Sequence, residues 1–233
     1  MLELWQSFLE LIPNVVYTRK ELLKCIIQTL QMVGWTTLYS AGFGVIFGVT
    51  LVVTQKEGIL ECKPVYQILD KLINVFRSIP FVILVALLIK LTRKISGTSI
   101  GTKGMIFPMI VATVPFLSRQ IHSALVEIDP GMIEAAQSMG ASIPEIIFKV
   151  IIPEAKTSLI VGATISSGTI LGYSAMSGAI GGGGLGKIAI SYGYNRYQTD
   201  VLLVTVVLLI VLMQIIQIIG MYISRKTDKR IRE

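Results

Sequence analysis

Charged side chains are scarce in this sequence. Asp, Glu, Lys and Arg make up 15% of the 233 residues, hydrophobic side chains make up 53%, and the mean hydropathy is +0.72. So few charges cannot coat a soluble globule of this size, and we therefore expect a membrane protein. The net charge of +7 does not indicate a nucleic-acid surface, because the Lys and Arg residues are scattered between apolar blocks. Anionic lipid headgroups are the expected partners of most of these cations.

Histidine and cysteine are almost absent. The single histidine, His122, has no partner at ligand spacing, so neither a metal site nor a catalytic triad is predicted. Cys25 and Cys62 lie on either side of a long apolar block that we expect to span the bilayer. The two thiols would then sit at opposite membrane faces, which excludes a disulfide between them.

The apolar blocks also lack the groups that intramembrane enzymes use. A protease or lipid transferase needs a nucleophile with a base, or paired acids, inside the spans. The blocks offer serines and tyrosines but no deep histidine, and Asp70 has no second membrane-buried acid at a helical spacing. We therefore predict that the chain is not an enzyme.

Long charge-free runs are what the sequence has in abundance. Residues 25–55, 157–186 and 201–224 carry no charge, and each is long enough for a membrane-spanning helix. The first run is also too long for the core of a cleavable signal peptide. Within it, Gly44 and Gly48 have the GxxxG spacing that lets another helix approach closely.

Two further charge-free runs are shorter and contain proline. Residues 78–89 include Pro80, and residues 104–118 include Pro108 and Pro115. Short, Pro-interrupted segments of this kind point to a transport pathway. The sequence thus predicts five crossings, two of them broken.

The second crossing is expected to carry charge. If it starts near Tyr66, it brings Asp70, Lys71 and Arg77 into the membrane. Charged side chains on a membrane-spanning helix are costly unless they face a cavity, an interacting side chain or the membrane–water interface.

The third long run changes character in its second half. Gly, Ser and Ala crowd the stretch GYSAMSGAIGGGGLG, residues 172–186. We expect the helix to end near Ala175 and irregular backbone to follow, which at membrane depth requires protein or water partners.

The basic tail sets the expected orientation. An odd number of crossings puts the two ends on opposite sides, and the tail SRKTDKRIRE holds five basic residues. The positive-inside rule then predicts a cytoplasmic C-terminus and an outer N-terminus, although the bias is weak. We expect residues 1–24 to be an extracytoplasmic extension, 25–224 the transmembrane domain and 225–233 a basic cytoplasmic tail.

The run GGGGLGKI, residues 181–188, comes within one residue of a phosphate-binding loop. Gly181, Gly186 and Lys187 have the required spacing, but Ile188 stands where Ser or Thr would hold Mg²⁺. No strand precedes the run to aim its N–H groups at a phosphate. We therefore predict a turn here rather than a nucleotide site.

The most specific pattern is EIDPGMIEAAQSMGASIPEIIFKVIIPEA, residues 127–155. Asp129 followed by Pro130 is a helix start, and Gly140 offers the left-handed conformation that ends a helix. Ser142 and Glu145 then have the spacing of a capping box. The segment is predicted to be a helix, a tight glycine corner and a second helix, with Pro144 in its first turn and Pro153 closing it.

Such a helix pair has two interpretations. A DNA-reading helix-turn-helix needs base-contacting side chains on the second helix, which here offers Ile146, Ile147, Val150 and Ile151. The favoured interpretation is docking, in which a short amphipathic helix lies in a groove of a soluble partner and transmits a rigid-body movement.

The residues of this segment resemble the EAA loop of bacterial ABC importer permeases. The resemblance lies in Glu134, Ala135 and Ala136, then Gly140, then Val150 to Pro153. The stretches NVFRSIPF, GTSIG and GYSAMSGAIGGGGLG are similar to those of methionine importer permeases in particular. The resemblance extends from the first predicted crossing onward.

The resemblance implies an all-α membrane fold with five crossings per chain, in the bacterial cytoplasmic membrane. It implies a homodimer bound to two separate ATPase subunits, which hold ATP and Mg²⁺, and fed by an extracytoplasmic binding protein. The expected function is ATP-driven import of an amino acid, most plausibly methionine, by alternating access. The alternatives are another small amino acid or organic solute, or a nucleotide-independent channel.

The resemblance also implies residue roles in the loop. Glu134 is the expected polar contact to the ATPase, Ala135 and Ala136 permit close packing, and Gly140 forms the corner ahead of Pro153. Without the surrounding motif, Glu134 would be interpreted as a solvated surface carboxylate.

Two further groups are candidates for the pathway. By the same resemblance, Met176, helped by Tyr173 and Ser174, is expected to narrow the closed pathway, the alternative being that Met176 only fills space on its helix. Arg77, Ser78 and Pro80 indicate a kinked helix whose charge faces the dimer interior or an interface. Alternatively, the Arg77 side chain extends to the lipid headgroups. The sequence does not distinguish these two interpretations.

Overall fold

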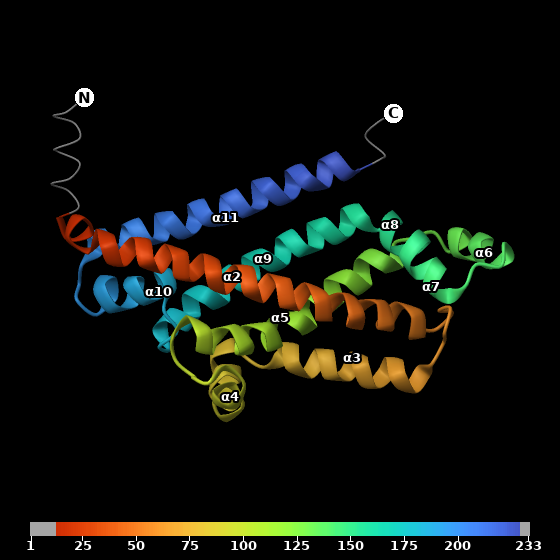
Figure 1. The fold of residues 1–233 in the computed structure, drawn as a ribbon, viewed down its shortest axis with the longest axis horizontal. Coiled ribbons are helices and arrows are strands. Elements are labelled where there is room, and N and C mark those ends of the chain that lie inside the picture. Colours follow the sequence, from red (N-terminus) through yellow and green to blue (C-terminus); the bar gives the residue numbers. More distant parts are fainter. Residues whose placement is uncertain (1–12, 229–233) are drawn as a thin grey trace. The chain divides into compact units, whose positions relative to one another are not determined.

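The computed structural model describes residues 13–228, and these residues form helices joined by short links. The elements in chain order are α2 (Pro13–Thr54), α3 (Lys63–Ser78), α4 (Phe81–Ser96), α5 (Gly101–Val126), α6 (Pro130–Ser138), α7 (Ile143–Glu145), the π-helical turn η1 (Ile146–Ile151), α8 (Ile152–Glu154), α9 (Lys156–Ala179), α10 (Gly184–Ile188), the π-helical turn η2 (Ala189–Tyr194) and α11 (Thr199–Thr227) (Figure 1).

The chain divides into two compact units. Unit 1 consists of Met1–Thr37, Pro80–Ile110 and Gly168–Ile215, and unit 2 of Leu38–Ile79, Val111–Ser167 and Ile216–Glu233. The long helices contribute residues to both units, and each unit is described separately below.

The predicted crossings correspond to long apolar helices. Four helical segments have the length and composition of a membrane span: Pro13–Thr54, Gly101–Val126, Lys156–Tyr194 and Thr199–Thr227. The pair α3 and α4 makes a fifth if it is counted as one broken span. The all-helical fold and the count of up to five crossings agree with the sequence-based expectation.

The second crossing is broken where the sequence predicted it. Ile79 and Pro80 both have extended backbone, with ψ of 122° and 137°, between the end of α3 and the start of α4. Pro80 cannot donate an N–H to the preceding turn, and proline also disfavours helical geometry at Ile79.

The prediction of a second broken crossing is wrong. Pro108 and Pro115 lie inside α5, which runs without interruption from Gly101 to Val126. A proline removes one intrahelical hydrogen bond. The other backbone N–H and C=O groups of the helix can form hydrogen bonds only with each other, because the bilayer offers them none. The helix therefore continues through both prolines.

The first helix begins earlier than the charge-free run suggested. α2 starts at Pro13, so residues 13–24 belong to the same 42-residue helix as the predicted span. The backbone N–H and side-chain amide of Asn14 donate to the two carboxylate oxygens of Asp200 at the start of α11, both at 3.0 Å. Residues 1–12 of the expected extension lie outside the described residues, as do residues 229–233 of the tail.

The expectation that the third long run becomes irregular after Ala175 is also wrong. α9 continues to Ala179, only residues 180–183 are irregular, and α10 and η2 are again helical. The small residues serve close packing. A Cβ on Gly178 would lie 2.1 Å from the backbone N of Lys187, and a Cβ on Gly186 would lie 2.0 Å from the carbonyl oxygen of Ala175.

Unit 1 is organised around the short helix α10, which lies beside the first half of α2 (Figure 1). Leu185 and Ile188 of α10 are fully buried and belong to one apolar cluster with buried residues of α2 and α11. Its first N–H groups are satisfied by α2, since the N–H of Gly184 donates to Gln28 Oε1 at 3.0 Å and that of Leu185 to Thr29 Oγ1 at 2.9 Å.

Unit 2 packs the second half of α2 against α5. A Cβ on Gly44 would lie 3.0 Å from Leu117 Cγ, and one on Gly48 would lie 2.6 Å from Ile121 Cγ2. The predicted GxxxG contact is therefore confirmed, with α5 as the helix that approaches. The same core continues through Leu125 and Ile128 into the segment that follows α5.

Candidate functional site: the helix pair after α5

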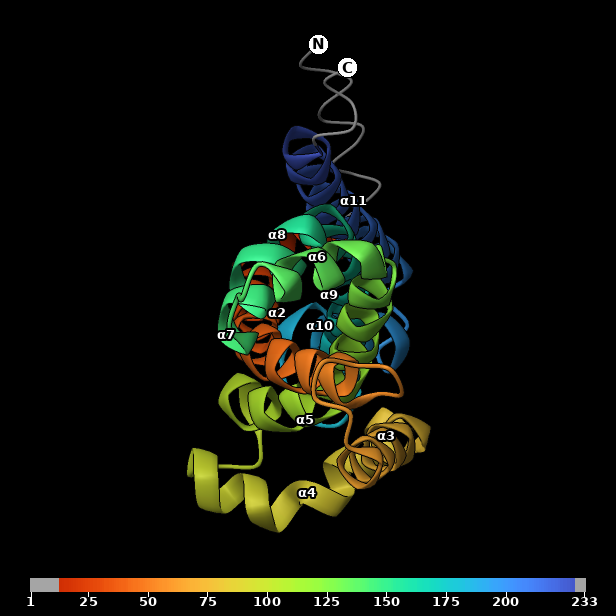
Figure 2. The same cartoon turned by 90° about the vertical axis from the view of Figure 1, so that its right-hand side faces the viewer.

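The segment after α5 folds as the capping residues predict. Asp129 is the N-cap of α6, and its Oδ1 accepts the backbone N–H of Gly131 at 2.8 Å. Pro130 occupies the first turn, where its missing N–H costs nothing. α6, α7 and α8 gather together in unit 2 (Figure 2).

The corner between α6 and α7 is made by Gly140. Its φ is +78°, in the left-handed region that side-chain-bearing residues rarely adopt, and its N–H donates to the carbonyl of Gln137 at 2.9 Å. The next N–H, of Ala141, donates to the carbonyl of Ala136 at 3.1 Å. No atom lies within 4 Å of the position a Cβ would take, so conformation alone requires glycine here.

The second helix starts with the predicted capping box. Glu145 Oε2 accepts the backbone N–H of Ser142 at 3.1 Å and its hydroxyl at 2.8 Å. Lys149 Nζ lies 2.8 Å from Glu145 Oε1. The bond from Lys149 and then those from Ser142 lower the pKa of the exposed Glu145 carboxyl from 4.5 to about 2. The carboxylate is thus ionised throughout the physiological range and can accept these hydrogen bonds.

The second helix widens before it ends. Residues 146–151 form the π-helical turn η1, in which the N–H of Ile152 donates to the carbonyl of Ile147. Pro153 follows within one residue, and the helix breaks at Ala155 before α9 begins. A π-turn next to a proline accommodates the ring and its missing N–H. Pro153 itself is helical and the helix ends two residues later, at Ala155, so the prediction that Pro153 closes the second helix is wrong.

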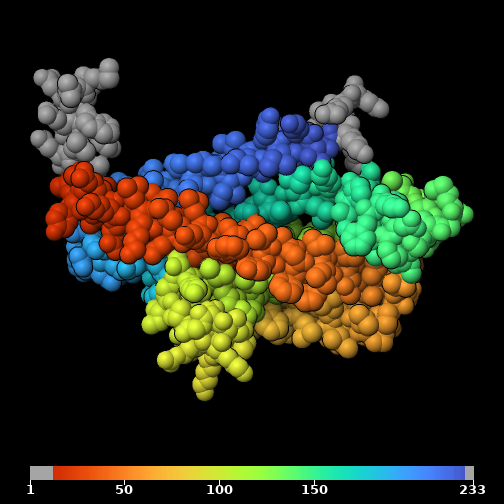
Figure 3. All heavy atoms as spheres, in the orientation of Figure 1, coloured from red at the N-terminus to blue at the C-terminus, as the bar shows by residue number. Residues whose placement is uncertain are grey.

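One face of the helix pair is built into unit 2. Ala136 is 4% exposed, and Ile146 and Ile151 are each 1% exposed, in one cluster with Val52 of α2 and Leu125 of α5. In the space-filling view, the side chains of this segment lie against the second half of α2 (Figure 3). The pair is therefore packed against α2 and α5 within unit 2.

Exposed apolar side chains lie beside the buried face, while Glu134 and Ser138 are opposite Ala136 on α6. Met139 is 81% exposed and Phe148 68% exposed, and Met132 and Ala135 are exposed beside them on α6. Met132, Ala135 and Met139 recur at the three- and four-residue spacing of one helix face. Sequence reasoning missed Met139 and Phe148. The available signal was a second apolar stripe on a helix whose first apolar stripe is buried.

The expected docking residues divide between the two faces. Glu134 and Ala135 are exposed, whereas Ala136 is buried. Glu134 lines a surface pocket together with Gln137 of α6 and the link after α2, including Gln55 and Glu57. Gly140 and Pro153 are located at the corner and at the end of the pair.

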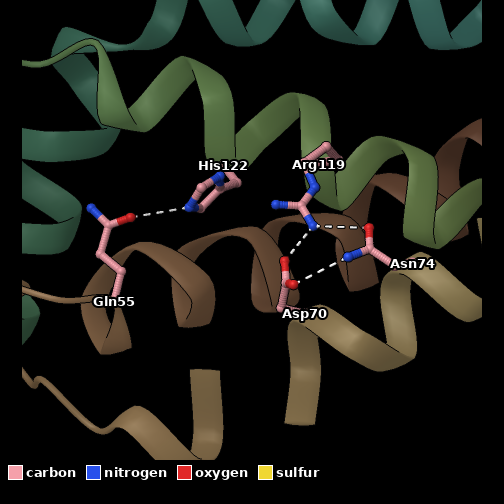
Figure 4. A network of polar contacts seen from close by, with 5 residues as sticks. All are labelled: Gln55, Asp70, Asn74, Arg119 and His122. Atoms are coloured by element: carbon pink, nitrogen blue, oxygen red, sulfur yellow. Dashed lines mark hydrogen bonds and ion pairs between the residues drawn. The ribbon is translucent and has the colours of Figure 1, made fainter. Parts of the chain in front are cut away.

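Polar side chains of unit 2 join α3 to α5 (Figure 4). Arg119 of α5 pairs with Asp70 and also donates to Asn74 Oδ1 at 3.2 Å, while Asn74 Nδ2 donates to Asp70 at 3.1 Å. His122 lies one turn further along α5, where its Nε2 is 3.1 Å from Gln55 Oε1. Asp70, one of the charges that the second crossing was expected to carry into the membrane, thus has a charged partner.

Arg77 continues the same contact between α3 and α5. Its guanidinium carbon lies 5.9 Å from the ring centroid of Phe116, within cation–π range. The Ser78 hydroxyl donates to the carbonyl of Asn74 at 2.9 Å, which leaves it no free donor. Pro80 is exposed at the break before α4. These three residues therefore do not form one cluster.

The three candidate gate residues on α9 do not share a face. Met176 is 52% exposed, whereas Ser174 is 1% exposed. The Tyr173 ring stacks on Phe81 of α4, with centroids 4.6 Å apart. Tyr173 and Met176 are three residues apart and lie on one side of α9, while Ser174 is turned about 100° away into unit 1.

Three N–H groups of the glycine run are already engaged within unit 1. The N–H groups of Gly182, Gly184 and Leu185 already donate to Ser177, Gln28 and Thr29. A Cβ on Gly182 or Gly184 would collide with neighbouring side chains, so the loop has no open cradle. Among the described residues there is also no group of three metal-ligating side chains.

Comparison with known proteins agrees with this architecture. Residues 42–233 match the family described as binding-protein-dependent transport system inner membrane component. A probable D-methionine transport system permease protein of Vibrio cholerae is 46% identical over 203 residues, covering 87% of this chain and 90% of that protein. The methionine import system permease protein of Bacillus subtilis is 40% identical over 218 residues, covering 94% of this chain and 97% of that protein.

A solved structure has the same fold. An inward-facing MetNI methionine ABC transporter contains a chain that matches with a TM-score of 0.90 and 40% sequence identity, covering 91% of this chain and 98% of that chain. The chain studied here therefore belongs to the family of binding-protein-dependent transport system inner membrane components, as a permease subunit similar to those of methionine ABC importers.

Proposed function

We propose that this chain is the membrane-spanning subunit of an ATP-driven importer of methionine, and that it works by alternating access. The observation that carries the proposal is the helix pair of residues 130–154, whose one face is buried in unit 2 and whose exposed surface carries Met132, Ala135, Met139 and Phe148 beside Glu134. Support for methionine comes from relatives that are methionine transport permeases along nearly their whole length. Hydrolysis of ATP belongs to a separate subunit, which holds the nucleotide and Mg²⁺.

The exposed face of the helix pair is the docking surface for that ATPase. Met132, Ala135, Met139 and Phe148 form its apolar part, and Glu134 supplies a carboxylate at its edge. Apolar anchors on a short helix are typical of helix-in-groove recognition. The small side chain of Ala135 lets the partner approach the backbone closely.

Transport follows from a rigid-body movement of the helix pair. When ATP closes two ATPase subunits together, the docked pairs of two permease copies move with them. Ala136, Ile146 and Ile151 transmit that movement to α2 and α5 through the core of unit 2. The two halves of the dimer then rock so that the pathway opens to the other side. Met176 and Tyr173 of α9 narrow the closed pathway.

The proposed topology has the helix pair and the C-terminus in the cytoplasm and the N-terminus outside. The helix pair precedes α9 and the α10 segment follows it, so a single crossing separates them in the chain. α10 and its flanking links are then extracytoplasmic, where the binding protein delivers its substrate.

Reconstitution tests the proposal directly. The chain would be placed in vesicles with the ATPase and the methionine-loaded binding protein, and uptake of labelled methionine would be measured. We expect uptake that needs ATP, both partners and an intact ATPase, and no ATP hydrolysis by the chain alone. Uptake without nucleotide would instead identify a channel, and uptake of other amino acids at equal rates would remove methionine as the substrate.

A further inference from the structure

Acidic side chains are concentrated in unit 2. Among the described residues, unit 2 has nine acidic and nine basic side chains, whereas unit 1 has two acidic and nine basic ones. Four of the nine acids of unit 2 line a single pocket of about 390 Å³, a volume typical of ligand pockets. The carboxylates belong to Glu127, Asp129, Glu154 and Asp228, and Lys156 is the one cation among the lining residues.

Segments from distant parts of unit 2 form the walls of this pocket, which we call the acidic pocket. Glu127 and Asp129 lie in the link between α5 and α6, and Glu154 ends α8. Residues 156–158 begin α9, and residues 227 and 228 lie at the end of α11. The acidic pocket therefore lies between the helix pair and the last apolar helix.

Three of the four carboxylates have unused hydrogen-bonding capacity. Glu127, Asp129 and Glu154 are exposed and take part in none of the ion pairs within residues 13–228. Asp129 Oδ1 accepts the N–H of Gly131 at 2.8 Å, and Glu127 Oε2 accepts the Ser158 hydroxyl at 3.4 Å. A carboxylate can accept about four hydrogen bonds, so each of the three can still bind a cation.

The acidic pocket also has an apolar part. Ala124, Ile128 and Ala155 are buried and line it together with Met132 and Pro153. An occupant that suits this lining carries positive charge together with at least one apolar side chain. A metal ion has no apolar part, and an anionic lipid headgroup would be repelled by the carboxylates.

The sequence supplies such a segment directly beyond the pocket wall. Residues 229–232 are Lys, Arg, Ile and Arg, and they follow Asp228, which itself lines the pocket. Four residues span at most about 14 Å, so this segment stays within reach of the pocket. A covalently attached segment also has an effective concentration of about the millimolar range at its site, which favours it over a separate partner.

We propose that residues 229–232 bind the acidic pocket, with their cations paired to Glu127, Asp129 and Glu154 and with Ile231 packed on the apolar part. Only 6% of an 18-residue apolar stretch of α11 is buried within the chain, so packing alone connects this helix sparingly. The bound tail joins the end of α11 to both ends of the helix pair. Its role in transport rests on the proposed function: a movement of the helix pair then reaches α11 as well as α2 and α5.

Cross-linking of the whole chain in nanodiscs of neutral phosphatidylcholine tests this docking. The reference chain carries Thr157→Cys in the pocket wall and Glu233→Cys beyond the tail cations, with Cys25 and Cys62 changed to alanine. The rate at which a short bismaleimide joins the two cysteines reports on tail binding. We expect Lys229→Glu/Arg230→Glu to lower this rate about tenfold, and added salt to lower the rate of the reference chain.

Two further variants control for unspecific effects of charge. Arg225→Glu/Lys226→Glu reverses two cations in the last turn of α11 that do not line the pocket, and it should leave the rate unchanged. Glu127→Lys/Glu154→Lys should lower the rate as the tail variant does, and the two combined should restore it, because opposite charges then face each other again. Equal rates in the reference chain and both reversed variants, or no recovery in the combination, would overturn the proposal.

Two arms of the experiment identify a different occupant or partner. If the reference chain cross-links as slowly as the tail variant in nanodiscs that contain phosphatidylglycerol, the tail binds lipid headgroups and the proposal is wrong. If adding the ATPase has that effect, the ATPase occupies the pocket and the proposal is equally wrong. Cross-linking uses neither ATP nor substrate, so a failed uptake assay contradicts the proposed function alone, and a failed cross-linking test contradicts tail docking alone.

Discussion

Gly140 is the residue whose role depends most clearly on backbone conformation. It holds the corner of the helix pair at φ +78°, with open space around the position of a Cβ. Gly140→Val would add about 1–2 kcal/mol of local strain without any steric clash. We expect this variant to insert normally, while ATP hydrolysis by the assembled complex continues and methionine uptake falls sharply. Asn tolerates this conformation, so Gly140→Asn should retain most of the uptake. Full uptake by Gly140→Val would remove the corner from the coupling mechanism.

The Asp70–Arg119 pair predicts a different response at the residue scale. Its side chains are only 27% and 25% exposed, so removing one partner leaves a charge in a poor environment. We expect Asp70→Ala to cost about 1.5–3 kcal/mol of stability, visible as a lower Tm of the detergent-solubilised protein. Asp70→Ala/Arg119→Leu should lose less than the sum of the single changes, in a double-mutant cycle. Additive losses would mean that the pair contributes no interaction energy.

Local features of the site were predictable from sequence because they obey rules of neighbouring residues. Asp129 with Pro130, Gly140, and the pair Ser142 and Glu145 each specify a cap or a corner within a few positions. The partner of Arg77 and the pairing of Asp70 with Arg119 were not predictable, since the residues are far apart in the chain. Met139 and Phe148 were missed because their exposure depends on which face of the helix pair the core of unit 2 covers.

At the scale of elements, glycine-rich stretches proved easier to find than to interpret. The run after Ala175 suggested irregular backbone, yet α9 continues because Gly178 and Gly186 let it contact α10 backbone to backbone. Sequence alone does not distinguish a glycine needed for a turn from one needed for close approach. The prolines of α5 were misjudged in the same way, since their effect depends on what surrounds the helix.

Two glycines of the same helix give a matched test of this packing. A Cβ on Gly178 would lie 2.1 Å from the backbone of Lys187, whereas a Cβ on Gly172 would meet nothing within 4 Å. We expect Gly178→Ala to displace α10 and lower the Tm, at a cost of about 1–3 kcal/mol, and Gly172→Ala to leave the Tm unchanged or raise it. Equal Tm values for the two variants would contradict the close contact of α9 with α10.

The start of the second helix of the pair makes a prediction about pH. The pKa of Glu145 is lowered to about 2 in the folded chain, so its stabilising contribution is complete above about pH 4.5 and is lost only as the pH falls toward 2. The ¹³C shift of the Glu145 carboxyl should therefore show no titration between about pH 5 and 8, and its midpoint should rise toward 4.5 in Lys149→Met. A midpoint near 4.5 in the parent chain would show that the capping box does not persist in solution.

On the scale of the whole molecule, composition and hydropathy were sufficient to predict an all-helical membrane protein, and the motif of residues 127–155 was sufficient to suggest its family. The separation of charge between a balanced unit 2 and a basic unit 1 was not evident, because the cations are spread over several segments of the chain. Only the fold brings the α4–α5 and α9–α10 links together, through the hydrogen bond from the N–H of Gly101 to the carbonyl of Gly181.

Hydrogen exchange of the assembled complex tests most directly whether the helix pair docks on the ATPase. Amide exchange of the permease would be compared with and without the ATPase, both in the same nanodiscs. We predict that residues 130–154 become protected when the ATPase binds, most strongly around Ala135, Met139 and Phe148. Protection confined to the links of unit 1, with residues 130–154 exchanging at the same rate in both samples, would contradict docking through the helix pair.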